Sequence, residues 1–414
     1  MARVLIASDK FKGSLTAEQV GAAVRAGIRR ARPDASVAVV PVADGGDGTV
    51  AAALAAGFDA VPLTASGPTG EPVLTAYARR DDLAVVEMAD VSGLVRLPEG
   101  RLRPMTATSR GTGEVMAAAV AAGCRRIVLG IGGSAGTDGG AGLLEALGAR
   151  LLDADGQPIG DGGAALARVH AIDLTALRER MDGVEVTVAC DVDNPLTGPY
   201  GAAAVYGPQK GADPAQVAEL DAALGQWAQR LAAELGSDRR DAAGAGAAGG
   251  VGFAALAVLG ATLRPGIELM LELVGFDAQL AGVDLVVTGE GKLDEQTLHG
   301  KAPAGVAAAA RAAGVPVVAV CGRNTLPADR LRETGFAAAY SLIEIEPDEQ
   351  RCLSAGAMLL QQLGIRIAHE HLPGGAGVGA VAAKQPRAKK QNNQEATYET
   401  AAPKGPGRRA SRGH

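Results

Sequence analysis

The 414-residue chain is 47 % apolar but only 3 % aromatic, which predicts about two domains with cores of Ala, Val and Leu. Its 58 glycines follow no three-residue period, which excludes a collagen-like fibre and favours tight turns. The net charge of −6 combines +6 in residues 384–414 with −12 in residues 1–383, and so acidic a body argues against a nucleic-acid enzyme.

In chain order, short β-branched runs alternate with glycine-rich polar loops and Ala-rich helical stretches. The runs occupy residues 3–8, 36–42, 125–131, 184–192, 283–289 and 316–322. The first helix should begin near Thr16, where T-A-E-Q forms a capping box, and residues 58–105 indicate short strands with little helix. This alternation predicts an α/β fold with mainly parallel sheets. Ligands of such sheets bind beyond the carboxyl ends of the strands, where every polar loop lies.

Domain boundaries are less clearly marked. We expect a Rossmann-like domain formed by residues 1–60 and 283–372, with residues 61–282 inserted as a second α/β domain. Two consecutive domains divided near residue 180 are the alternative. Residues 373–414 are polar, basic and aperiodic, which predicts a disordered tail; contact of this tail with RNA or an anionic surface is the less favoured alternative to a solvated extension.

Cysteine usage and hydropathy bear on location. The four cysteines are far apart and form no C-x-x-C pair, which is typical of reduced thiols in a cytoplasmic protein. Residues 242–263 are uncharged over a length that could cross a bilayer, but six glycines favour a buried loop and helix instead. We therefore expect no membrane partner.

The stretch 127–148, "IVLGIGGSAGTDGGAGLLEALG", has the most distinctive glycine loop. Its bare backbone can turn N–H groups toward an anion at the start of a helix. Ser134 and Thr137 could donate hydroxyl hydrogen bonds, and Asp138 could hold magnesium. The alternative is a tight strand-to-helix turn with Asp138 as its N-cap.

Four further loops carry charged residues at strand ends. "DKFKGS" (9–14) places Lys10 and Lys12 before a helix, and "DGGDG" (44–48) supplies two carboxylates. "CDVDNP" (190–195) and "GEGKLDEQT" (289–297) add further acids and a lysine. Each loop alone suits capping and turn chemistry. Together they mix cations for phosphates, acids for magnesium and a carboxylate for a hydroxyl proton, which phosphoryl transfer requires.

Taken together, these motifs resemble those of the type I glycerate kinase family. The resemblance is carried, over residues 3–372, by "ASDKFKGSLTA", "PVADGGDGT", "GIGGSAGTDGGAGLLEALG", "ACDVDNPLTGPYGAAAVYGPQKGA", "GAAGGVGFAALAVLGA" and "VVTGEGKLDEQTLHGKAP". It implies ATP-dependent, Mg²⁺-assisted phosphorylation of D-glycerate in cytoplasmic glyoxylate, glucarate or serine-related metabolism. It also implies two α/β domains with the active site in the cleft between them.

Residue roles follow from the same resemblance. Asp191 is expected to accept the proton of the attacking hydroxyl, while Lys12 and Lys292 neutralise the transferring phosphoryl group. Substrate and phosphate contacts are expected from Lys10, Ser14, Gly132, Gly133, Ser134, Thr137, Asp193, Glu290 and Asp294, and magnesium ligands from Asp44, Asp47 and Asp138. The 2-hydroxyl is favoured over the 3-hydroxyl, and homo-oligomerisation stays open.

Two other functions remain. A nicotinamide-dependent hydroxyacid dehydrogenase would use the G-x-G-x-x-A match at Gly130, Gly132 and Ala135, with Asp153 on the ribose. A non-enzymatic phosphometabolite sensor would share the anion loops but would not need so many acids. The kinase accounts for more of the residues than either.

Overall fold

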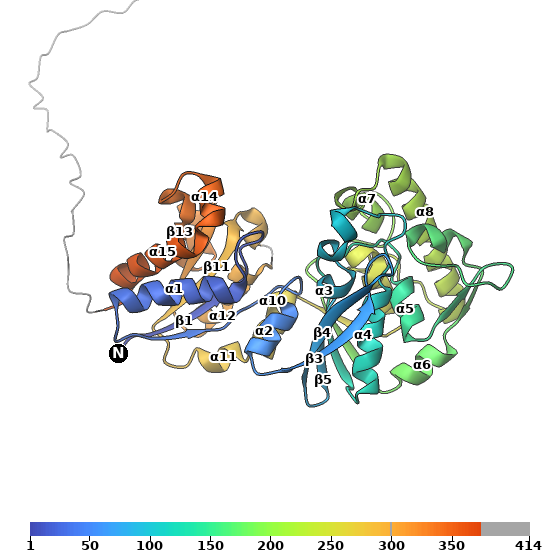
Figure 1. Ribbon diagram of the computed structural model, residues 1–414, viewed down its shortest axis with the longest axis horizontal. Coiled ribbons are helices and arrows are strands. Elements are labelled where there is room, and N and C mark those ends of the chain that lie inside the picture. The colour runs from blue at the N-terminus through green and yellow to red at the C-terminus, as the bar shows by residue number, and fades with distance from the viewer. Residues whose placement is uncertain (299, 374–414) are drawn as a thin grey trace, which may run out of the picture. The chain divides into compact units, whose positions relative to one another are not determined.

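The structure, a computed structural model, describes residues 1–298 and 300–373 (Figure 1). Two large sheets and a small antiparallel pair of strands carry the fold of this part of the chain. From residue 374 onward, the predicted disordered tail lies outside the described residues.

The first sheet has five parallel strands in the order β13-β12-β11-β1-β2. These are β1 (Arg3–Ser8), β2 (Ser36–Val39), β11 (Leu285–Leu293), β12 (Val317–Asn324) and β13 (Phe336–Ser341). Their almost uninterrupted burial explains the β-branched runs, because both faces of a parallel sheet are covered. All six predicted runs became strands that start within two residues of the expected position; the runs 36–42 and 184–192 each ended three residues early, at Val39 and Ala189.

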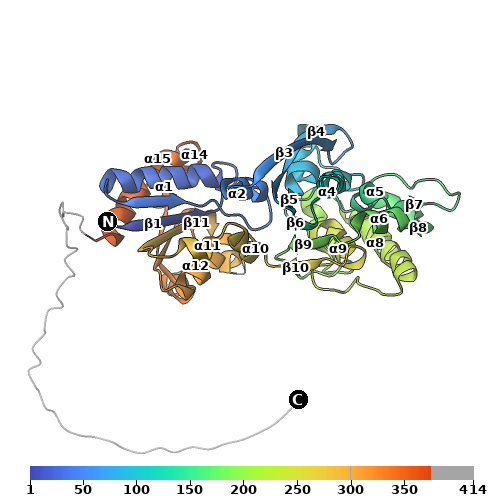
Figure 2. The same cartoon turned by 90° about the horizontal axis from the view of Figure 1, so that it is seen from below.

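Helices cover both faces of this sheet (Figure 2). One face holds α1 (Ala17–Ala31) and α15 (Gly356–His371), which lie side by side in Figure 1. The other holds α10 (Gly266–Leu273), α11 (Phe276–Gln279), α12 (Ala302–Ala312) and α13 (Ala328–Glu333). Thr16 caps α1 through the predicted capping box with Gln19. The helices α1 and α15 can cross closely because Gly27 has no side chain. A Cβ at this position would lie 2.0 Å from the Gln361 carbonyl oxygen.

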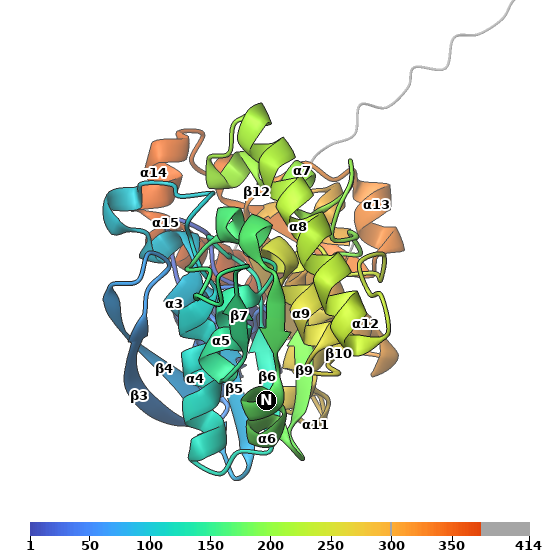
Figure 3. The same cartoon turned by 90° about the vertical axis from the view of Figure 1, so that its right-hand side faces the viewer.

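The second sheet has six strands in the order β10-β9-β6-β5-β4-β3 (Figure 3). They are β3 (Asp59–Ser66), β4 (Pro72–Arg80), β5 (Leu83–Glu87), β6 (Arg126–Gly130), β9 (Glu185–Ala189) and β10 (Thr262–Arg264). The pairs β3–β4 and β4–β5 are antiparallel and the other three pairs are parallel. The short strands expected within 58–105 are thus an antiparallel extension of a parallel sheet.

Short and long helices surround the second sheet. They are α2 (Thr49–Ala55), α3 (Ala89–Ser92), α4 (Arg110–Ala121), α5 (Ala141–Leu147), α6 (Thr175–Met181), α7 (Ala202–Tyr206), α8 (Pro214–Leu235) and α9 (Val251–Ala257). The core is aliphatic apart from a few rings such as Trp227, whose indole N–H donates to the Gly139 carbonyl oxygen at 3.0 Å. The small pair is β7 (Arg150–Leu152) with β8 (Ala171–Asp173), and α14 (Glu349–Ser354) precedes α15.

Two predictions about organisation can be compared with this fold. The mixed α/β class with mainly parallel sheets is confirmed. The division into two domains at residues 60 and 282 stays a prediction. The helix α2, inside the first predicted segment, packs against β4 and β5 of the second sheet, and α10, inside the predicted insertion, packs on the first sheet. No helix among residues 1–298 and 300–373 is long and apolar enough to cross a membrane, and residues 242–263 instead contain α9 and the start of β10.

Candidate active site

Two adjoining cavities lie at the carboxyl ends of the strands. The larger is about 910 Å³ and the smaller about 230 Å³. Their walls share four residues from the "DGGDG" loop and the loop after β6, namely Asp44, Gly46, Gly132 and Gly133. A pocket of the larger size suits a drug-sized ligand, whereas the smaller one lies below the range usual for such ligands. The arrangement therefore offers space for one large and one small ligand on either side of a shared wall.

Glycine is required where the two loops meet. A Cβ on Gly132 would lie 2.6 Å from the Gly46 Cα, and one on Gly130 would lie 2.6 Å from the Gly45 carbonyl oxygen. The Gly132 amide donates to the Gly45 carbonyl oxygen at 3.1 Å, which fixes the two loops to each other. The absence of side chains at these glycines thus allows the two loops to touch. The backbone of Gly132 and Gly133 also forms part of the shared wall.

The larger cavity is lined by both kinds of charge. Its lysines are Lys10, Lys12, Lys292 and Lys301, and its carboxylates include Asp9, Asp44, Asp47, Glu290 and Asp294. Lys292 pairs with Asp294 at 3.0 Å, and Lys301 pairs with Glu290 at 3.7 Å. Burial raises the pKa of Glu290, and a hydrogen bond from Thr297 opposes that rise. This mixture suits a polyphosphate whose charge is balanced by lysines.

Asp9 is, with Glu349, one of two acids of this cavity that the sequence analysis did not single out. It lies at the end of β1, and its carboxylate accepts a hydrogen bond from the Lys10 amide at 2.6 Å. Burial raises its pKa to about 7, against the opposing charge of Lys10 and with help from the negative charge of Asp44. Such a carboxylate is favoured in its ionised form by any additional cation nearby.

The "DGGDG" loop is held in place from β5. Glu87 lies at the end of this strand and is only 9 % exposed. Its two carboxylate oxygens accept hydrogen bonds from the Gly48 amide at 3.1 Å and the Val50 amide at 2.9 Å. Since Gly48 has no side chain to cap α2, Glu87 supplies the missing acceptor and fixes the loop that carries Asp44 and Asp47.

We expect Glu87→Ala to lower the free energy of unfolding by about 1–3 kcal/mol, because two amides at the start of α2 lose their acceptor. Urea denaturation measures this loss. The matched control is Glu219→Ala at an exposed position of α8, where the change should stay within about 0.5 kcal/mol. Equal stability of the two variants would contradict the capping role.

Asp191 lies at the smaller cavity, just beyond the end of β9. The amide of Gly266, at the start of α10, donates to its Oδ1 at 2.7 Å and orients the carboxylate. The residue as a whole is exposed, but protein atoms around the carboxylate desolvate it and raise its pKa to about 6. A carboxylate with that pKa is suited to accept a proton near neutral pH.

Lys210 and Ser134 provide hydrogen-bond donors in the same cavity, where Asp191 provides an acceptor. Lys210 belongs to the short 3-10 helix η4 (Pro208–Lys210), and its Nζ donates to Ser134 Oγ at 2.8 Å and to the Gly136 carbonyl oxygen. Both residues are buried, and both line the smaller cavity only. Burial lowers the pKa of Lys210 to about 8, which the negative charge of Asp138 partly offsets.

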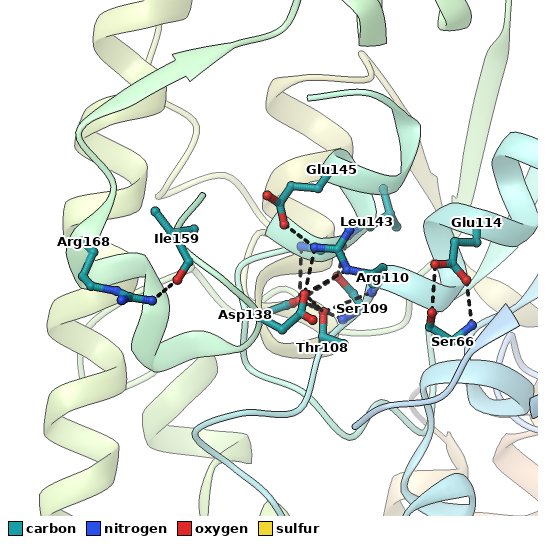
Figure 4. A network of polar contacts seen from close by, with 12 residues as sticks. Ser66, Thr108, Ser109, Arg110, Glu114, Asp138, Leu143, Glu145, Ile159 and Arg168 are labelled. Carbon is teal, nitrogen blue, oxygen red and sulfur yellow. Dashed lines mark hydrogen bonds and ion pairs between the residues drawn. The ribbon is translucent and has the colours of Figure 1, made fainter. Parts of the chain in front are cut away.

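Asp138 faces away from both cavities into a buried polar network (Figure 4). Its carboxylate accepts hydrogen bonds from the Ser109 amide at 2.7 Å, Ser109 Oγ at 2.8 Å and the Gly140 amide at 3.1 Å. Thr108 Oγ1 and the Gly142 amide complete the set at 3.3 Å each. This geometry favours the alternative in which Asp138 satisfies first-turn amides, and the magnesium prediction for Asp138 stays untested.

The predicted site residues thus divide into three groups. Those at the larger cavity are Lys10, Lys12, Ser14, Asp44, Asp47, Gly132, Gly133, Glu290, Lys292 and Asp294. The smaller cavity has Ser134 and Asp191 in addition to the shared Asp44, Gly132 and Gly133. Thr137, Asp138 and Asp193 line neither cavity; Thr137 is fully buried and its hydroxyl has no hydrogen-bond partner among the described residues. Among the polar lining residues, the sequence analysis missed Asp9, Tyr206, Gln209, Lys210, Gln296, Lys301, Arg323 and Glu349.

Cations, carboxylates and bare backbone around adjoining large and small cavities suit a small-molecule phosphotransferase. The chain matches the model of the glycerate kinase family over residues 4–372. It is 45 % identical to a glycerate kinase of Bacillus subtilis (strain 168) over 82 % of this chain and 90 % of the relative. A glycerate 2-kinase of Escherichia coli (strain K12) is 43 % identical over the same shares.

A solved structure of similar fold also comes from this family. The crystal structure of a proposed glycerate kinase 2 from Salmonella typhimurium LT2 superposes with a TM-score of 0.76 at 41 % identity, covering 89 % of this chain and 97 % of that one. The chain belongs to the glycerate kinase family and is a kinase with ATP as its co-substrate. This confirms the family expected from the motifs.

Proposed function

We propose that this protein transfers the γ-phosphoryl group of ATP to the 2-hydroxyl of D-glycerate and forms 2-phosphoglycerate. The observation that carries the proposal is the shared wall of Asp44, Gly46, Gly132 and Gly133 between a cavity of about 910 Å³ and one of about 230 Å³. ATP would occupy the larger cavity and glycerate the smaller, so that the reacting atoms meet at the shared wall.

The chemistry would be divided between the two cavities. Lys12 and Lys292 would neutralise the transferring phosphoryl group from the larger cavity, with Lys10 and Lys301 on the remaining phosphate charge. Asp191 would accept the proton of the attacking hydroxyl from the smaller cavity. The bond between the bridging oxygen and the γ-phosphorus breaks as the hydroxyl oxygen bonds to that phosphorus, which leaves ADP.

Magnesium is part of the proposal. Among the described residues, no three carboxylate, imidazole or thiolate groups converge on one point. Mg²⁺ in kinases is commonly held by one or two carboxylates together with phosphate oxygens, and the carboxylates of Asp44 and Asp47 in the larger cavity fit that role. The ion would neutralise phosphate charge when bound.

The preference for the 2-hydroxyl rests on the relatives. The Escherichia coli protein that is 43 % identical is named for phosphorylation at that position, whereas the Bacillus subtilis relative is named only as a glycerate kinase. A cytoplasmic location and any homo-oligomeric state stay predictions.

Phosphorus NMR of the purified protein with Mg·ATP and D-glycerate tests the proposal. We expect a phosphomonoester signal whose coupling to a single carbon-bound proton identifies 2-phosphoglycerate. Coupling to two such protons would identify 3-phosphoglycerate and overturn the position. ATP that stays intact at high enzyme concentration would reject the glycerate assignment and favour a sensor.

The dehydrogenase alternative has less support. Asp153, the expected ribose ligand, lines neither cavity, and its Oδ1 accepts hydrogen bonds from the Asp155 and Gln157 amides at 3.0 and 2.9 Å. Absorbance at 340 nm in a mixture of the protein, NAD and glycerate would reveal hydride transfer. We expect no change.

A further inference from the structure

The ammonium group of Lys210 is buried beside the smaller cavity without a paired anion. The residue is 2 % exposed, and no carboxylate of residues 1–298 or 300–373 lies within 4.0 Å of its Nζ. Its two protein acceptors, Ser134 Oγ and the Gly136 carbonyl oxygen, are both neutral. A buried charge in such surroundings is costly unless an opposite charge is supplied.

The hydrogen-bond inventory of this cluster leaves donors for a ligand. An ammonium has three N–H donors, and two of them are used by the protein. Ser134 Oγ accepts from Lys210, which leaves its own O–H available to donate. Both groups line the smaller cavity, so two donors, one of them charged, face the same small space.

We infer that Lys210, together with Ser134, binds the carboxylate of the acceptor substrate and thereby restricts this kinase to small hydroxycarboxylates. The identity of that substrate rests on the proposed function. A phosphate of the nucleotide is the less suitable partner, because neither Lys210 nor Ser134 lines the larger cavity. With the carboxylate held at Lys210, the hydroxyl groups of a three-carbon acid are left to reach Asp191 and the shared wall.

The direct test compares D-glycerate with D-glyceramide, its uncharged amide of nearly the same shape, by calorimetry in the absence of ATP. Wild-type protein should bind D-glycerate at least tenfold more tightly than the amide. Lys210→Met should weaken D-glycerate binding by about 10- to 100-fold, the loss typical of a charge-assisted hydrogen bond, and reduce the preference over the amide to below about threefold.

Lys12→Met is the matched comparison, because it removes one lysine charge from the larger cavity alone. Because Lys12 is expected to neutralise the transferring phosphoryl group, the substitution should lower kcat, but it should leave the binding of D-glycerate in the absence of ATP within about twofold. If Lys210→Met weakens D-glycerate and the amide by the same factor, Lys210 is structural and the inference is wrong.

A second measurement needs no variant. Between pH 6.5 and 7.5 the affinity of the wild type for D-glycerate should be constant, and above about pH 8 it should fall toward tenfold per pH unit as Lys210 loses its proton. An affinity that stays constant to pH 9.5 would overturn the inference. Ser134→Ala should lower the affinity for D-glycerate by a smaller factor, about five- to tenfold. This variant and the pH titration together test the carboxylate site even if Lys210→Met does not fold.

The two proposals can fail separately. Binding of D-glycerate that depends on Lys210 without any phosphomonoester product would uphold the carboxylate site and reject the kinase reaction on glycerate. Phosphorylation of D-glycerate by a folded Lys210→Met variant with unchanged KM would uphold the kinase reaction and reject the carboxylate site.

Discussion

Replacing Asp191 with Asn is expected to lower kcat for D-glycerate phosphorylation by about 10²- to 10⁴-fold, the range typical of losing a general base. The amide has almost the same shape and can still accept a hydrogen bond from the Gly266 amide through its oxygen, so the local fold should persist. It cannot accept the hydroxyl proton. Initial rates at saturating Mg·ATP and D-glycerate measure the loss.

The pH dependence provides a second readout of the same residue. Because surrounding protein raises the pKa of Asp191 to about 6, kcat/KM should fall below that pH as the carboxylate becomes protonated and can no longer act as a base. The fall should reach tenfold per pH unit and disappear in Asp191→Asn. Asp9, with its pKa near 7, lies at the other cavity and is unchanged by this substitution, so a limb that persists in the variant would be assigned to it.

Asp193→Asn is the matched control. This exposed residue lies two positions further along the same loop and lines neither cavity, so kcat should stay within about threefold of the wild type. If Asp191→Asn raises only the KM for D-glycerate, Asp191 is a binding residue. An equal loss in both variants would point to a general distortion of the loop.

Local patterns allowed much of the framework to be predicted. The T-A-E-Q capping box located the start of α1 because capping depends on residues three positions apart. The β-branched runs located most strands of both sheets, since a strand buried on both faces needs continuous apolar sequence. The rule that ligands bind beyond strand ends then brought "DKFKGS", "DGGDG" and "GEGKLDEQT" to one cavity.

The direction of side chains within the glycine loop could not be predicted. Ser134 and Asp138 are four residues apart, yet Ser134 faces the smaller cavity and Asp138 faces the network around Ser109. The backbone directly before Ser134 and directly after Asp138 uses left-handed φ angles, of 74° at Gly133, 62° at Gly139 and 74° at Gly140. Each such glycine reverses the course of the backbone in a way that residue spacing does not record.

Lys210 was missed for a different reason. Its contact with Ser134 joins residues 76 positions apart, and "YGPQKGA" contains no second charged residue that would mark it as a cluster. Only packing of η4 against the glycine loop makes this lysine a cavity residue. A lone lysine in a run of small residues is a signal that becomes informative once its burial is known.

The second large effect is expected at Asp138. Asp138→Ala should lower the free energy of unfolding by at least about 3 kcal/mol, because five buried donors lose their acceptor and each is costly to leave unsatisfied. The substitution also removes the negative charge that partly offsets buried Lys210. Since whole proteins are stable by only about 5–15 kcal/mol, a reduced yield of folded protein should accompany the loss.

Urea denaturation of Asp138→Ala should be set beside Asp161→Asn, which alters the same network at a side chain that is 40 % exposed and should cost less than about 1 kcal/mol. The result separates the two roles considered for Asp138. A structural carboxylate predicts lost stability with an unchanged magnesium dependence of the remaining folded enzyme. A magnesium ligand predicts the opposite, a stable protein whose apparent KM for Mg²⁺ rises, as we expect for Asp44→Asn at the shared wall. Because the described donors contact both carboxylate oxygens of Asp138, we expect the first outcome.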